Sequence, residues 1–155
     1  MVHSLPHVVR RESPASADAN RLPRIAVVDD SPEFVALLDE IFAERFEVVG
    51  ASGQSVHRIA EAQPQLLIVD SQPASGLGGS AWQLVNLARD HAQLRDVPII
   101  VCTTDYVSFD ADGERLARLE NVHLMAKPFA LDVLEKLVAR LVPGARVETR
   151  RAAAS

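Results

Sequence analysis

The sequence has little cysteine, few aromatic residues and no long apolar run. Its one cysteine, Cys102, lies in the apolar run Ile99–Cys102, so an internal disulfide is excluded and a reducing compartment is favoured. A nucleophilic Cys102 is an alternative, but no catalytic pattern surrounds it. No apolar run approaches the ~20 residues that span a bilayer, and the N-terminus lacks the apolar segment of a secretory signal peptide. We therefore expect a cytoplasmic protein without membrane insertion.

The chain also has no excess of basic residues. It carries 16 Lys and Arg against 21 Asp and Glu, a net charge of -5, which gives no general attraction to nucleic acid or to an acidic membrane. Its 155 residues, 48% of them hydrophobic, suit one domain with a sizeable core. We expect that domain at residues 23–143, between a flexible N-terminal leader (1–22) and a flexible C-terminal tail (144–155).

A short apolar run that ends on a carboxylate organises the chain. Leu66–Val69 is too short for a helix and is rich in branched side chains, which is typical of a fully buried strand. Asp70 follows directly, and the Gly, Pro and Ser residues of segment 72–79 end the strand. Asp70 is therefore expected at the carboxyl end of a buried strand, where open α/β sheets bind ligands.

Short apolar runs alternate with helical patterns along the chain. The expected strands are 25–28, 47–51, 66–69, 99–102 and 122–125; the expected helices begin at Pro32 and near Val56 and Ala81, with a weak helix at about 112–120 and a well-formed one at 131–141. Ser31, Pro32 and Glu33 are a typical helix start. Right-handed crossovers then give the α/β class, with a doubly wound, five-stranded parallel sheet.

Polar residues follow four of the five expected strands, at the same edge of the sheet. They are Asp29, Asp30, Asp70, Thr103 and Lys127. Clustered carboxylates repel one another unless a cation joins them, and oxygen ligands with room for water suit Mg²⁺. A hydroxyl and an ammonium suit an anion with several oxygens, such as a phosphoryl group. Each residue alone could be a turn former, a helix cap or a solvated charge, but together they favour phosphoryl transfer to an aspartate.

These motifs resemble the receiver domain of two-component response regulators over about residues 24–142. The matching stretches are Val27-Val28-Asp29-Asp30-Ser31, Leu67-Ile68-Val69-Asp70, Pro98-Ile99-Ile100-Val101-Cys102-Thr103 and Lys127-Pro128-Phe129. The resemblance implies a flavodoxin-like (βα)5 fold and phosphorylation of Asp70 by a sensor histidine kinase or a phosphotransfer protein.

The resemblance also implies a role for each site residue. Mg²⁺ would be held by Asp30, Asp70 and the backbone carbonyl of Gln72, with Asp29 acting through water. Thr103 would bond the phosphoryl group, and Lys127, in a usually cis Lys-Pro bond, would pair with it.

The sequence departs from the receiver pattern at three places. Pro73 lies three residues beyond the acceptor instead of four, Thr104 replaces a smaller residue, and Leu124 stands at the usual aromatic switch position. Tyr106 or Phe109 could substitute as a mobile aromatic. These departures bear on how the metal loop is shaped and on how phosphorylation would be transmitted.

Two hypotheses of different kinds follow. The first is a stand-alone receiver that acts on a downstream protein target through a surface near the last strand and the helices beside it; homodimer formation stays open. The second is a degenerate receiver-like interaction module that acts without phosphorylation.

Two other functions fit the sequence less well. A phosphatase with Asp70 as nucleophile would need an acid two residues on, where this chain has Gln72. Gly76–Gly79 does not have the spacing of a dinucleotide-binding loop.

Overall fold

Five parallel strands form one sheet in the computed structural model, which describes residues 21–53, 55–70, 81–103 and 118–143. The strands are β1 (Arg24–Val28), β2 (Glu47–Gly50), β3 (Leu66–Asp70), β4 (Ile99–Thr103) and β5 (Val122–Ala126). Their order is β2-β1-β3-β4-β5, so the direction of winding reverses between β1 and β3. The predicted doubly wound parallel sheet is confirmed.

The described helices are α2 (Pro32–Phe42), α3 (Val56–Glu61), α4 (Ala81–Asp90) and α6 (Leu131–Leu141). Each begins where the sequence pattern placed it. Of the weak helix expected at about 112–120, residues 112–117 lie outside the described residues, and 118–120 form a turn. The proposed leader and tail also lie largely outside them, so the domain boundaries stay a prediction.

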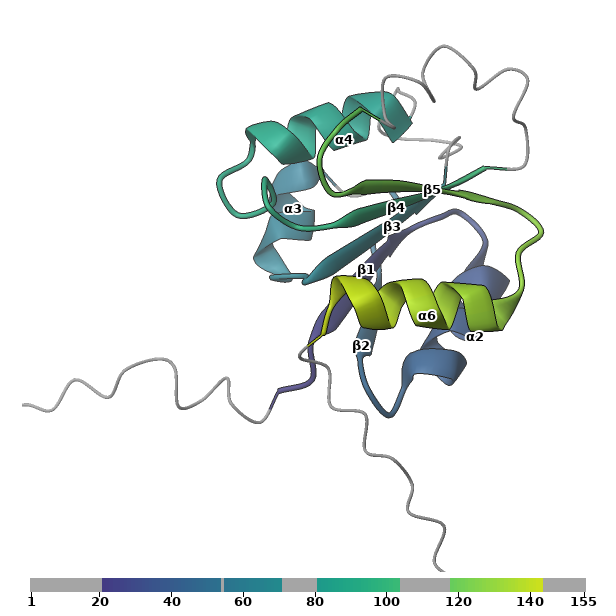
Figure 1. Cartoon of the computed structure of the whole chain (residues 1–155). Coiled ribbons are helices and arrows are strands. Elements are labelled where there is room, and N and C mark those ends of the chain that lie inside the picture. The colour runs from purple at the N-terminus through teal and green to yellow at the C-terminus, as the bar shows by residue number, and fades with distance from the viewer. Residues whose placement is uncertain (1–20, 54, 71–80, 104–117, 144–155) are drawn as a thin grey trace, which may run out of the picture.

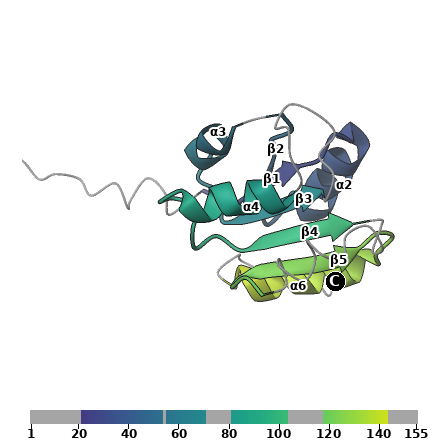
Figure 2. The same cartoon turned by 90° about the horizontal axis from the view of Figure 1, so that it is seen from above.

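Helices cover both faces of the sheet, with α3 and α4 on one face and α2 and α6 on the other (Figures 1 and 2). Neighbouring residues of β1 alternate between the two cores: Ile25 and Val27 pack with α2 and α6, whereas Ala26 and Val28 pack with α3 and α4. A strand buried on both faces must be apolar at every position. The polar residues at its end therefore mark where the buried layer stops.

The start of α2 follows from three adjacent residues. The Ser31 hydroxyl accepts a hydrogen bond from the Phe34 backbone N at 3.2 Å, and Pro32 occupies the first turn. The Ser31 backbone N in turn donates to Asp29 Oδ1 at 2.9 Å. This cap fixes both the helix and the acidic corner that precedes it.

Arg89 joins two loops at the opposite end of the sheet. Its Nη1 donates to the carbonyls of Leu94 (3.3 Å), Arg95 (3.0 Å) and Val97 (2.9 Å), and its Nη2 donates to that of Glu120 (3.0 Å). The planar guanidinium can serve several carbonyls at once, which a lysine ammonium does less well.

We expect Arg89→Ala to lower the free energy of unfolding by about 2 kcal/mol, because partly buried carbonyls lose a charged donor. Arg89→Lys should recover only part of this loss. Urea unfolding measures both variants, with Arg58→Ala, an exposed position on α3, as the control. A loss for Arg89→Ala no larger than that of the control would contradict the role of Arg89.

Candidate functional site

The carboxyl ends of β1, β3, β4 and β5 bring the polar residues to one edge of the sheet. Val28 pairs with Val69, so Asp29 and Asp70 follow at the same level on adjacent strands. Asp70 pairs with Cys102, which precedes Thr103, and Thr103 pairs with Ala126, which precedes Lys127. Adjacent strands lie about 4.8 Å apart. The register alone therefore makes these residues neighbours.

Lys127 reaches from the end of β5 to the end of β1. Its Nζ lies 2.9 Å from Asp29 Oδ2, and the Asp29 residue is only 6% exposed. The Lys127 backbone N donates to the Thr103 carbonyl at 2.7 Å, which holds the chain beside β4. The Lys127–Pro128 bond is cis, as the resemblance implied. A buried carboxylate and an ammonium are thus paired across the site.

The Lys127 ammonium has a second contact, which the sequence does not predict. Nζ lies 4.4 Å from the centroid of the Phe34 ring, and Phe129 meets that ring edge-on with centroids 6.2 Å apart. Phe34 was interpreted only as part of the apolar face of a helix. No sequence signal distinguishes a phenylalanine that packs from one that also holds a cation.

Asp30 is exposed and accepts a hydrogen bond from Ser52, which follows β2. The Ser52 hydroxyl donates to Asp30 Oδ1, and both residues line a groove of about 570 Å³ that also includes Asp29 and Asp39. Ser52 was not predicted, although the signal was present. It follows β2 just as Asp29, Asp70 and Thr103 follow or end their own strands.

Asp70 and Thr103 lie where the sequence placed them. Asp70 is the last residue of β3 and is partly buried, and Thr103 is the last residue of β4 and is 1% exposed. Gln72, whose carbonyl was expected to bind the metal, lies outside the described residues, as do Thr104, Tyr106 and Phe109.

The charges of the site act on the thiol beneath it. Burial raises the pKa of Cys102 to about 12; Lys127 opposes this rise, and Asp70 and Asp29 add to it. Three of the predicted site residues therefore lie close enough to influence one buried group. A buried thiol with a raised pKa stays protonated at neutral pH, which argues against Cys102 as a nucleophile.

The oxygen donors suit Mg²⁺ in kind, but the described side chains do not complete a site on their own. Within the described ranges, no three His, Cys, Asp or Glu side chains are grouped so that they could hold a metal ion. Asp29 is paired with Lys127, and Asp30 is hydrogen-bonded to Ser52. A cation bound by these acids would therefore require Asp29 and Asp30 to change these partners.

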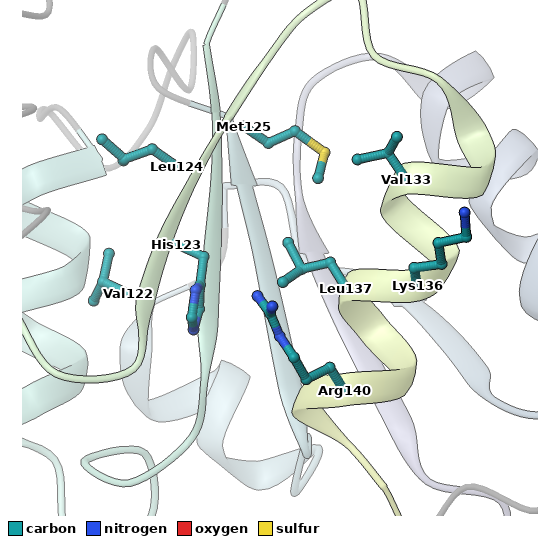
Figure 3. Close-up of a pocket in the computed structure, with 8 residues that line it drawn as sticks. All are labelled: Val122, His123, Leu124, Met125, Val133, Lys136, Leu137 and Arg140. Atoms are coloured by element: carbon teal, nitrogen blue, oxygen red, sulfur yellow. The ribbon is translucent and has the colours of Figure 1, made fainter.

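A second cavity, of about 710 Å³, lies between β5 and α6 (Figure 3). It is lined by Val122, His123, Leu124, Met125, Val133, Lys136, Leu137 and Arg140. His123 Nε2 is buried there without a hydrogen-bond partner among the described residues. Burial lowers the pKa of His123, and the nearby Arg140 lowers it further. We call this cavity the β5–α6 groove.

The lowered pKa of His123 makes the stability of the fold pH-dependent. The unfolded chain binds a proton at His123 at higher pH than the folded chain does, so unfolding becomes easier as the pH falls from about 6.5 toward the folded pKa. We expect His123→Gln to flatten the fall in unfolding free energy between about pH 7 and pH 5.5. Urea unfolding across this range measures it. Identical slopes for the two proteins would contradict the assignment.

The solved structures that are similar to this chain include receiver domains. The chemotaxis response regulator CheY4 of Vibrio cholerae is matched with a TM-score of 0.65 and 20% identity, over 77% of this chain and 98% of that one. The signal receiver domain of a signal transduction histidine kinase from Syntrophus aciditrophicus gives a TM-score of 0.65 and 23% identity, over 86% and 99% of the two chains.

A further similar structure contains a metal ion. It is the receiver domain of the sensor histidine kinase PA1611 from Pseudomonas aeruginosa, with a magnesium ion coordinated in its active site cleft; the TM-score is 0.64 and the identity 22%, over 79% of this chain and 98% of that one. No protein-family model and no curated protein matches the sequence. The chain has the CheY-like, flavodoxin-type fold of response regulator receiver domains.

Proposed function

We propose that this chain is a receiver that accepts a phosphoryl group on Asp70 from a histidine kinase or a phosphotransfer protein. The observation that carries the proposal is the ion pair between Lys127 Nζ and Asp29 Oδ2 at 2.9 Å. It joins the ends of β5 and β1 at the edge where β3 ends in Asp70 and β4 in Thr103. Acid, hydroxyl and amine are the groups that such a transfer needs.

In the proposed reaction, a carboxylate oxygen of Asp70 attacks the phosphorus of the donor. A new O–P bond forms, the P–N bond to the donor histidine breaks, and its electron pair stays on the histidine nitrogen. The Thr103 hydroxyl then donates to a phosphoryl oxygen. Lys127 leaves Asp29 and pairs with the phosphoryl group on Asp70. The Lys127 ammonium therefore neutralises the Asp29 carboxylate before the transfer and the phosphoryl group after it. The chain acts as a phosphoacceptor and not as an enzyme; at most it phosphorylates itself slowly from small phosphodonors and slowly removes its own phosphoryl group.

Mg²⁺ belongs to the proposal as the cation that would neutralise the acids and the transferred oxygens. Asp30, Asp70 and the Gln72 carbonyl would hold it, and Asp29 would act through water. The support is the all-oxygen donor set and the magnesium in the cleft of the Pseudomonas aeruginosa receiver domain.

The experiment is to incubate the protein with acetyl phosphate and to count incorporated phosphoryl groups by intact mass. With Mg²⁺ present we expect up to one group per chain, and with the metal chelated we expect almost none. Equal incorporation under both conditions, or none under either, would contradict the proposal.

The β5–α6 groove is the proposed output surface, and its occupant is an acidic segment of a downstream protein. Lys136 and Arg140 are the charged residues that line the groove, and both are basic in a chain of net charge -5. Figure 3 shows the Arg140 side chain extending from α6 toward His123 on β5, with the apolar side chain of Leu137 beside it. The stand-alone arrangement stays a prediction. None of the helices in the described ranges is long and apolar enough to cross a membrane.

Leu124 supports the second candidate, a receiver-like module that works without phosphorylation. It lines the groove at the usual aromatic switch position, and a leucine offers no ring whose rotation could report the state of Asp70. This candidate requires the beryllofluoride-treated and untreated proteins to bind a partner equally well. A tenfold change in affinity, about 1.4 kcal/mol, would exclude it.

A further inference from the structure

The first turn of α2 places an aromatic ring against the ammonium of Lys127. The Phe34 backbone N is bonded to the Ser31 hydroxyl at 3.2 Å, so the start of the helix fixes where this residue stands. Lys127 Nζ lies 4.4 Å from the Phe34 ring centroid, well inside the ~6 Å range of a cation–π contact. The Lys127 side chain is 21% exposed, and partial exclusion of water strengthens such a contact.

Phe129 supports the ring from the other side of the site. It lies two residues after Lys127, and its ring meets Phe34 edge-on at 6.2 Å and 73°. Both phenylalanines are partly buried against the core shared by α2 and α6. The ring that contacts the ammonium is therefore held by its own helix and by the loop that carries the lysine.

The ring contact restricts a side chain that would otherwise be mobile. A lysine has a flexible four-carbon stem and a compact charge, and one hydrogen bond to Asp29 leaves much of that freedom. The face of the Phe34 ring attracts the ammonium as well, so that Asp29 is not its only partner. The ion pair and the ring contact together hold the ammonium at the end of β1, which lies next to β3 and its last residue, Asp70.

We propose that Phe34 is a positioning residue for Lys127: it keeps the ammonium inside the site and so speeds phosphoryl transfer to Asp70. This inference rests on the proposed function. It depends on an aromatic residue at the third position of α2 and not on the acids themselves.

The test compares ring and non-ring side chains at position 34. We expect Phe34→Leu to slow phosphorylation by acetyl phosphate about fivefold, which corresponds to about 1 kcal/mol, whereas Phe34→Tyr keeps the ring and stays close to the wild-type rate. Phe34→Met repeats the non-ring comparison if the leucine variant folds poorly. Ile41→Ala, at another partly buried position of α2 that packs on the same core, controls for loss of packing.

A second readout follows the ammonium directly. In the wild type and in Phe34→Tyr, the Lys127 side-chain protons should be shifted upfield in NMR spectra by the ring current, and in Phe34→Leu this shift should disappear. A wild type that labels, together with a leucine variant that labels equally fast or keeps the shift, overturns the inference alone. A wild type that does not label overturns the proposed function and with it the inference.

Discussion

Asp70→Asn is expected to lower phosphoryl incorporation from acetyl phosphate at least about 100-fold. The amide has no anionic oxygen to attack phosphorus, whereas its size and shape match those of the acid. Asp70 ends β3 at the edge of the sheet where Asp29, Thr103 and Lys127 also lie. Intact mass after incubation with Mg²⁺ and acetyl phosphate measures the incorporation.

Asp39→Asn is the matched control for this prediction. Asp39 is an exposed acid of α2 that lines the groove beside Asp30, so its amide removes one nearby charge and leaves the acceptor intact. We expect labelling of this variant to stay within about twofold of wild type. Full labelling of Asp70→Asn would place the acceptor elsewhere, and equal losses in both variants would point to a general effect of charge.

Lys127→Met is expected to lower the free energy of unfolding by about 2 kcal/mol. The substitution leaves the carboxylate of Asp29, which is 6% exposed, without its cation. A fully buried pair would give a larger loss, but the 21% exposure of the Lys127 side chain lets water screen part of the charge.

A double-mutant cycle separates this pairing from the packing of the lysine stem. Asp29→Asn removes the buried charge, so adding it to Lys127→Met should restore most of the lost stability. Urea unfolding of the four proteins in metal-free buffer gives the coupling energy. Strict additivity of the two substitutions would contradict a functional ion pair between these residues.

The strand ends show why so much of the fold was predictable from the sequence. In a parallel sheet buried on both faces, a strand such as Leu66–Val69 must be apolar throughout, and the first polar residue marks its end. All carboxyl ends meet at one edge, so the neighbours of Asp70 follow from topology alone. Ser31 likewise identified the start of α2 through its cap.

Side-chain partners could not be predicted in the same way. The reach of Lys127 to Asp29 crosses the edge of the sheet from β5 to β1, and no spacing in the sequence encodes it. The contact with Phe34 depends on the angle at which α2 leaves the acidic corner. The partner of Asp30, Ser52, could have been found by applying the strand-end rule to β2 as well.

A crystal structure of the protein with Mg²⁺ and beryllofluoride tests the phosphoacceptor site most directly. We expect beryllium bonded to a carboxylate oxygen of Asp70, with the Thr103 hydroxyl and Lys127 Nζ against its fluorines and the ammonium displaced from Asp29. An Asp70 without the adduct at saturating beryllofluoride, with Lys127 still paired to Asp29, would contradict the assignment of this edge of the sheet as a phosphoryl-accepting site.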